Sequence, residues 1–383
     1  MPPVTRSSRV LPGPGLRRGP RPLALHLALA ASSNAGSPSW NGSSPSFAPA
    51  FASVDPALIR AIAAYRRHPW RRDLPDPPAT WAEGGSQLLD YSAPEGGVGS
   101  PILFVPSLVN RAHVLDLMPG RSLLRWLAGE GIRPLLLDWG WPGEAELDFT
   151  LTDYVARIER ALVALGRPTV LAGYCMGGLL AVAASLRQPA LVHALVVLAT
   201  PWDFHAEQLA DAVRLGILAP LLDPVMAGGT LPVDAIQTLF ALAEPGSVAA
   251  RYRAFAQLDQ GSEAAAGFVA IEDWLNDGVP LTVPVAREVF QGWYGANTPA
   301  RGRWRVAGWP VKPCLIRIPA FVAVPARDRI VPPGSALALA RALPGAAVHH
   351  PQAGHIGMVA GRRWQTELGA PLLGWLRGLD APK

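Results

Sequence analysis

The clearest chemistry in the sequence lies at Cys175, within the run Gly173-Tyr174-Cys175-Met176-Gly177-Gly178. A β-branched, apolar run over residues 168–172 precedes this run, and a small-residue helical run over residues 179–186 follows it. A nucleophile on a strained strand-to-helix turn needs such glycines, because larger flanking side chains would clash with the strand and the helix. The N-terminus of a helix also favours the thiolate form of a cysteine. The pattern predicts a cysteine nucleophile; the alternative is a buried structural cysteine beside a tight turn.

Two further side chains stand where a base and its partner acid would be needed. Asp328 follows a predicted strand over residues 320–324, and His355 follows the last predicted strand, over residues 347–350. Nucleophile, acid, histidine is the chain order that nucleophiles on such turns use. His355 is predicted to accept the Cys175 proton, and Asp328 to orient the imidazole and stabilise its charged form. A solvated turn aspartate and a histidine that caps a helix are the alternatives.

Attack on a carbonyl also requires backbone N–H donors for the developing oxyanion. One is expected from Met176, the residue after the nucleophile. The other is expected from the loop over residues 106–110, with Val109 as the favoured donor. A thiol exchanges acyl groups with thioesters at little net cost in free energy, so an acyl-cysteine suits acyl groups that arrive on another thiol. The second cysteine, Cys314, is predicted to be structural.

Short apolar strands alternate with helical runs at the spacing of βαβ units. This spacing predicts a mostly parallel sheet with helices on both faces. Together with the turn at Cys175, it is typical of the α/β-hydrolase fold. The predicted strands cover residues 102–105, 133–138, 168–172, 191–198, 320–324 and 347–350, and the predicted helices cover residues 57–65, 122–129, 152–165, 179–186, 335–343 and 362–379. Thr152 is the expected N-cap of the helix over residues 152–165.

Composition divides the chain into four predicted segments. Residues 1–54 are rich in Pro, Ser, Gly and Arg. They are predicted to be a disordered tail or a targeting-like segment, or to result from a start codon that is assigned too far upstream. Residues 55–202 are predicted to form the first part of the α/β-hydrolase core. Residues 203–303 are helical and loop-like, with several prolines, and are predicted to be a helical cap insertion over the sheet. Residues 304–383 are predicted to complete the core.

The composition also excludes several classes of protein. Half of the 383 residues are hydrophobic and 16% are charged, which excludes a disordered or fibrous chain. Two cysteines exclude a disulfide framework and a cysteine-based zinc site, so no metal is expected and the cytoplasm is the default compartment. The net charge of +5 equals the five arginines of residues 1–54, so no nucleic-acid partner is expected. No apolar run has the length of a membrane span.

The chain resembles the polyhydroxyalkanoate synthases over roughly residues 60–380. The resemblance is carried by residues 105–127, 173–178, 273–277, 328–332 and 354–357. Arg329 stands where the family usually has histidine after the acid, and Leu275 interrupts the family's usual Trp-Asn pairing.

This resemblance implies polymerisation of 3-hydroxyacyl-coenzyme A into polyester, with Cys175 carrying the acyl chain and coenzyme A released. It implies no cofactor, since coenzyme A enters as the substrate thioester. It also implies substrate-binding roles for Asn110, Trp274 and Asp277. The implied partners are a second synthase subunit or a second copy of this chain, and the surface of a polymer granule.

Three functions are compatible with these residues. The first is the acyltransferase just described. The second is a cysteine-dependent ester or thioester hydrolase, such as a polyhydroxyalkanoate depolymerase or an enzyme similar to dienelactone hydrolase, which would use the same side chains but deliver the acyl group to water. The third is a non-catalytic granule-associated protein, against which the complete set of Cys175, Asp328 and His355 argues.

Overall fold

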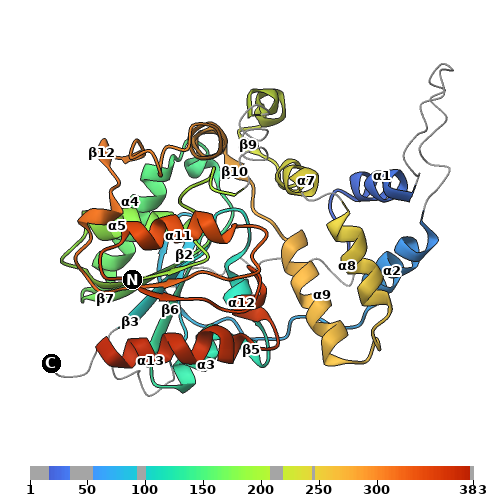
Figure 1. The fold of residues 1–383 in the computed structure, drawn as a ribbon, viewed down its shortest axis with the longest axis horizontal. Coiled ribbons are helices and arrows are strands. Elements are labelled where there is room, and N and C mark those ends of the chain that lie inside the picture. Colours follow the sequence, from blue (N-terminus) through green and yellow to red (C-terminus); the bar gives the residue numbers. More distant parts are fainter. Residues whose placement is uncertain (1–16, 35–54, 93–100, 208–218, 244–245, 380–383) are drawn as a thin grey trace, which may run out of the picture. The chain divides into compact units, whose positions relative to one another are not determined.

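The computed structural model describes residues 17–34, 55–92, 101–207, 219–243 and 246–379. They fall into two compact units, which we describe separately (Figure 1). The helical unit is drawn from Met1–Arg71 and Glu244–Asn276. The sheet unit is drawn from Arg72–Ala243 and Asp277–Lys383. The candidate nucleophile, acid and histidine all belong to the sheet unit.

An eight-stranded sheet forms the centre of the sheet unit, in the order β1-β2-β6-β3-β7-β8-β13-β14. The β1–β2 and β2–β6 pairs are antiparallel, and the pairs from β6 to β14 are parallel. The strands are β1 (Ala79–Glu83), β2 (Ser86–Asp90), β3 (Pro101–Val105), β6 (Arg133–Asp138), β7 (Thr169–Tyr174), β8 (Val192–Leu198), β13 (Ala320–Ala323) and β14 (Ala347–His349). The predicted mostly parallel sheet is therefore confirmed, and the six predicted strands match to within two residues at each end.

Helices cover both faces of this sheet. α4 (Leu151–Leu165), α5 (Met176–Arg187) and α11 (Pro333–Ala342) pack on one face and share a core with the central strands. α3 (Leu123–Gly129) and α13 (Ala370–Leu379) lie on the other face (Figure 1). Strands buried on both faces must be apolar throughout, which is why β3 and β8 consist almost entirely of Leu, Ile, Val, Phe and Ala.

Shorter elements complete the sheet unit. The remaining helices are η1 (Ala112–Leu115), η2 (Glu144–Glu146), η3 (Ala219–Met226), α7 (Val233–Ala243), α10 (Val283–Arg287), η4 (Glu288–Gly295), η5 (Pro313–Leu315), α12 (Gly357–Ala360) and η6 (Gln365–Gly369). Three short antiparallel pairs are β4 (Asp116–Met118) with β5 (Arg121–Ser122), β9 (Thr230–Leu231) with β10 (Leu281–Thr282), and β11 (Arg305–Val306) with β12 (Trp309–Pro310). The described residues 203–303 contribute no strand to the large sheet, as predicted.

Two predicted helices differ from the structure. The N-cap of α4 is Thr150 rather than Thr152, because the Asp153 carboxylate accepts hydrogen bonds from the Thr150 N–H (2.8 Å) and hydroxyl (2.6 Å). The single helix predicted over residues 362–379 is instead divided into a π-helical turn, η6, and α13. Gly369 ends that turn, and a Cβ there would lie 3.1 Å from the Trp126 and Trp364 rings.

The helical unit contains α1 (Leu23–Asn34), α2 (Pro56–Arg67), α8 (Ser247–Ala256) and α9 (Glu263–Asn276). Its core includes Ala30, Tyr65, Tyr252 and Val269, so each of these helices contributes to it. The unit departs from the predicted segments in two ways. The predicted tail contains α1, because the apolar run near residue 30 buries Ala30. Residues 246–276 of the predicted cap insertion belong to the helical unit, together with α2, and the other described residues of that segment belong to the sheet unit.

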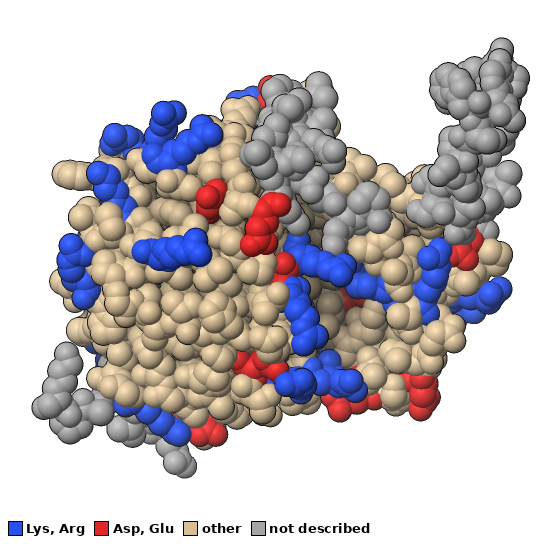
Figure 2. Space-filling view, in the orientation of Figure 1, with Lys and Arg blue, Asp and Glu red and all other residues tan. Residues whose placement is uncertain are grey.

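The distribution of surface charge and the length of the helices are relevant to nucleic-acid and membrane partners. Figure 2 shows Lys and Arg side chains dispersed over the face in view, with Asp and Glu side chains between them. Among the helices built from the described residues, none combines the length and the apolar character that crossing a membrane requires.

Candidate active site

The strand-to-helix turn at Cys175 has the strained geometry that the sequence predicts. β7 ends at Tyr174, α5 begins at Met176, and Cys175 between them has φ 55° and ψ −130°. A positive φ is costly for a residue with a side chain, so the surroundings must hold this conformation. The Cys175 N–H donates to the Leu198 carbonyl (2.9 Å), and the Gly178 N–H donates to the Cys175 carbonyl (3.0 Å). The thiol is partly buried at the carboxyl end of β7.

The glycine at 177 is required by the close approach of α5 to the end of β3. A Cβ at this position would lie 2.1 Å from the Val105 carbonyl oxygen and 2.5 Å from that of Pro106. We expect Gly177→Ala to lower the free energy of unfolding by about 3 kcal/mol or more, because backbone atoms cannot move aside as a flexible side chain can. Urea denaturation would measure the loss.

Gly374→Ala is the matched control for this prediction. Gly374 lies exposed in α13 with nothing within 4 Å of its Cβ position. Alanine there should raise stability by about 1 kcal/mol, since it favours a helix interior over glycine. Equal stability of the Gly177→Ala variant and the unmodified protein would contradict the packing argument.

Asp328 and His355 lie together, as the sequence predicts. His355 Nδ1 donates to Asp328 Oδ2 at 2.7 Å, and both residues are buried. The other carboxylate oxygen, Oδ1, accepts the N–H groups of Ile330 and Val331, each at 2.9 Å. The carboxylate is therefore held on both oxygens, and its direction toward the imidazole is fixed.

The electrostatics of His355 favour the protonated imidazolium. Burial alone would lower the pKa of His355, but the charges of Asp328 and Cys175 and hydrogen bonds to both raise it to about 10. With Nδ1 bonded to Asp328, the other ring nitrogen, Nε2, is the one left for the thiol. The arrangement can therefore hold a proton on His355 while the cysteine attacks.

The loop after β3 carries Val109, the residue predicted to supply the second oxyanion donor. The Val109 N–H donates to Ser107 Oγ at a long 3.4 Å, and the Val109 carbonyl accepts from the Val279 N–H at 3.0 Å. Asn110 forms a bridge with Gly278. Its side-chain Nδ2 is buried without a hydrogen-bond partner among the described residues. Such an orphaned donor is costly unless a ligand satisfies it, which favours the predicted substrate-binding role for Asn110.

Met176 occupies the other predicted donor position. As the first residue of α5 it has no acceptor for its N–H within the helix. Both oxyanion assignments, Met176 and Val109, stay predictions.

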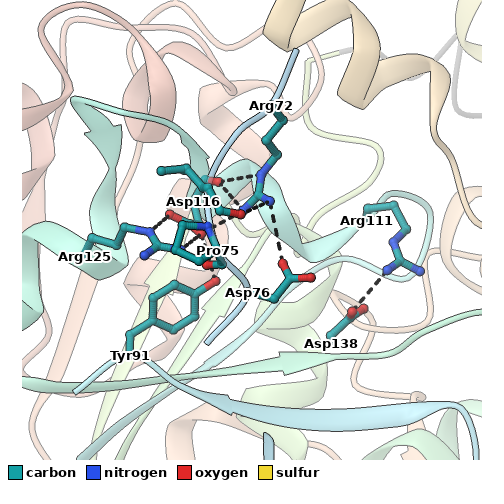
Figure 3. A network of polar contacts seen from close by, with 9 residues as sticks. Arg72, Pro75, Asp76, Tyr91, Arg111, Asp116, Arg125 and Asp138 are labelled. Carbon is teal, nitrogen blue, oxygen red and sulfur yellow. Dashed lines mark hydrogen bonds and ion pairs between the residues drawn. The ribbon is translucent and has the colours of Figure 1, made fainter. Parts of the chain in front are cut away.

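Two arginine–aspartate groups hold the rest of that loop (Figure 3). The fully buried Asp116 accepts hydrogen bonds from Arg125 at 2.7 and 3.0 Å and from Arg72 at 2.8 Å. Arg111 donates to Asp138 at 3.1 Å. A buried carboxylate is stable only when it is paired in this way. The segment between β3 and β4 is thus anchored on both sides of η1.

Two tyrosines near the nucleophile were not predicted. The Tyr174 hydroxyl donates to the His355 carbonyl (3.3 Å), and the two rings lie 5.0 Å apart. Burial and then the charge of Cys175 raise the pKa of Tyr294 above its ordinary range, which places that phenol near the thiol. The Tyr294 ring also contacts Phe204, at 4.9 Å between centroids. Tyr174 lies inside the glycine motif, whereas Tyr294 lies in a segment without any sequence pattern.

The remaining predicted positions are more scattered. Trp274 lies buried in α9 of the helical unit, and Asp277 is the first residue of the sheet unit after it, directly before Gly278. Cys314 is exposed in η5, ahead of β13 and so at the opposite end of the parallel strands from Cys175. Because the Cys314 side chain is exposed and does not pack in the core, the predicted structural role of this cysteine is wrong. The roles of Trp274 and Asp277 stay predictions.

The comparison with known proteins identifies the family to which this chain belongs. A model of the alpha/beta hydrolase family matches residues 102–364. The chain therefore belongs to the alpha/beta hydrolase family. Within it, the sequence is similar to poly(3-hydroxyalkanoate) polymerase subunits, which confirms the predicted resemblance.

Three of these relatives are each 28% identical to this chain. The subunit PhaC of Haloferax mediterranei matches over 77% of this chain and 62% of its own length. That of Synechocystis sp. matches over 72% and 77%, and that of Allochromatium vinosum over 78% and 87%. The chain thus spans less than two thirds of the length of the Haloferax protein, but more than two thirds of the length of the Synechocystis and Allochromatium proteins.

A solved structure agrees on the fold. A hydrolase from Oleispira antarctica superposes with a TM-score of 0.50 at 15% identity, over 76% of this chain and 94% of that one.

Proposed function

We propose that this protein is an acyltransferase that polymerises 3-hydroxyacyl-coenzyme A into polyhydroxyalkanoate through an acyl-cysteine. The observation that carries the proposal is a cysteine on the strained turn with the hydrogen-bonded His355–Asp328 pair beside it. The similarity to poly(3-hydroxyalkanoate) polymerase subunits over most of the chain supports this substrate class.

The residues would act in two half-reactions. In the first, the Cys175 thiolate attacks the thioester carbonyl, and the bond from that carbon to the coenzyme A sulfur breaks. The proton held on His355 passes to the leaving thiolate, so free coenzyme A departs. In the second, His355 takes the proton of a 3-hydroxyl group, whose oxygen attacks the acyl-cysteine, and the bond to the Cys175 sulfur breaks. Asp328 holds the imidazole in the tautomer that both steps need.

Transfer to a hydroxyl requires that water be kept from the acyl-cysteine. His355 is 6% exposed, and Phe204 and Tyr294 are partly buried beside the core that Cys175 also contacts. Aromatic surroundings of this kind reduce access of water to the reactive carbonyl.

The product of the reaction tests the proposal. Purified protein should release coenzyme A from 3-hydroxybutyryl-coenzyme A and form an insoluble polyester, which methanolysis and gas chromatography would quantify. The assay should be run alone and with a candidate partner subunit, since the resemblance to the synthases implies a second subunit. Release of coenzyme A with free 3-hydroxybutyrate as the sole product would instead establish the hydrolase.

A further inference from the structure

A groove lies on the sheet unit at the opposite end of the parallel strands from Cys175. It has a volume of about 780 Å³ and is bounded by the C-terminal end of α5, the β11–β12 hairpin and η5, which precedes β13. Its wall is mostly apolar and includes Leu186, Val306 and Ile316. None of the described residues that line it belongs to the candidate active site, so the groove is a separate feature of the molecule.

Two large apolar side chains at this groove are exposed to solvent. Trp309 in β12 is 72% exposed and Leu315 in η5 is 56% exposed. The hairpin that carries Trp309 is held in place, because Val306 is buried and the Ala307 N–H donates to Thr152 Oγ1 (3.1 Å). Large apolar side chains that an anchored segment exposes beside a groove are typical of a binding surface.

The charged side chains of the groove are all basic. Arg187, Lys312 and Arg317 line it, and no acidic residue does so among the described residues. Arg187 is ion-paired with Glu159. Lys312 and Arg317 face no carboxylate within the part of the chain that the structure describes, and the Arg317 guanidinium donates to the Cys314 carbonyl (2.6 Å), which fixes its position without neutralising its charge. The groove therefore complements an anionic ligand.

The size and the polarity of the groove favour a small ligand with a single anionic group. Its volume of about 780 Å³ lies within the range of roughly 300–1,000 Å³ that is usual for small-molecule sites. Among the described residues that line it, Ser185 alone carries a hydroxyl, and its Oγ already donates to the Ala181 carbonyl (2.8 Å). An extended peptide would therefore find few partners for its backbone N–H and C=O groups. An alkyl chain needs no such partners, and a carboxylate at its end would meet Lys312 and Arg317.

We propose that this groove binds a free fatty acid, with the carboxylate at Lys312 and Arg317 and the alkyl chain along the apolar wall. Contact with the alkyl chain would remove Trp309 and Leu315 from water, which is a favourable change for side chains of this kind. The inference is independent of the proposed function, because no residue of the groove takes part in the reaction at Cys175.

Titration calorimetry with dodecanoate, kept below its critical micelle concentration, tests the inference. The unmodified protein should bind dodecanoate saturably. In the variant with both Lys312→Gln and Arg317→Gln, the affinity should fall about tenfold or more, because two charge-assisted contacts are lost. Lys312→Arg keeps the charge and should leave the affinity nearly unchanged. Arg362→Gln is the matched control, since Arg362 is also exposed but does not line the groove.

A second variant and a second ligand keep the test independent of how the double variant folds. Leu315→Glu places a carboxylate at an exposed position of the groove, so it should weaken dodecanoate binding and leave the circular dichroism spectrum unchanged. Dodecyltrimethylammonium, which has the same alkyl chain but a positive head group, should bind the unmodified protein about tenfold or more weakly than dodecanoate. Equal affinity of the unmodified protein and the double variant for dodecanoate, or equal affinity of the unmodified protein for both ligands, would overturn the inference. Either result would leave the acyltransferase standing, since that proposal is tested by turnover at Cys175.

Discussion

Cys175→Ala is expected to abolish coenzyme A release from 3-hydroxybutyryl-coenzyme A, lowering kcat on the order of 10⁴-fold or more. In the proposed mechanism the thiol is the group that forms the covalent bond, and alanine has no atom that could replace it. The variant should fold normally, because the strained backbone at this position is held by hydrogen bonds of the main chain rather than by the thiol. Release of coenzyme A, followed with a thiol reagent, provides the measurement.

Cys314→Ala is the control for this substitution. Its thiol is exposed at the opposite end of the strands, so this variant should retain full activity. Unchanged release of coenzyme A by the Cys175→Ala variant would rule out the cysteine mechanism altogether.

Asp328→Asn is the second substitution from which a large effect is expected, a decrease in kcat on the order of 10³- to 10⁴-fold. The amide oxygen can still accept from Ile330 and Val331, so the amide nitrogen would face His355. The imidazole would then carry its proton on Nε2, toward Cys175, and could no longer accept the thiol proton. Steady-state kinetics would show the loss. Asp223→Asn, which removes only an exposed ion pair with Arg287, should leave kcat within twofold.

The same variant should change how stability depends on pH. The pKa of His355 is raised from an ordinary 6.5 to about 10 in the folded protein. A raised pKa stabilises the folded state fully below pH 6.5, and this contribution is lost as the pH rises through about 10. Urea midpoints of the unmodified protein should therefore fall between these pH values, and less steeply in the Asp328→Asn variant. Identical slopes would show that Asp328 does not raise the pKa of His355.

The sequence was sufficient for the parts of the fold that local rules determine. The glycines around Cys175 are required by backbone contacts within one turn, and the buried strands are apolar throughout, so both could be recognised without a structure. Asp328 and His355 could be placed because each follows such a strand. The hairpin of β1 and β2 was missed, although Gly84-Gly85 between two alternating runs is a turn signal, because β1 is largely exposed and lacks an apolar run.

Other features depend on contacts between distant segments and had no local signal. Tyr294 comes close to Cys175 only through the packing of η4, and its neighbours in the sequence show no motif. The helical unit joins α2 to α8 and α9, which nearly 200 residues of chain separate, so composition alone assigned them to different segments. The buried, unpartnered Nδ2 of Asn110 is likewise visible only in the folded chain.

The bridge between Asn110 and Gly278 has a consequence for the synthesis of the protein. The loop after β3 and the turn at Cys175 leave the ribosome early, but Gly278, Asp328 and His355 leave it late. Because long-range contacts form only once both partners exist, the nascent chain holds Cys175 before Asp328 and His355, and Asn110 before Gly278. Acyl transfer should therefore begin only on the finished polypeptide, and chains that stop before His355 should carry an unactivated thiol.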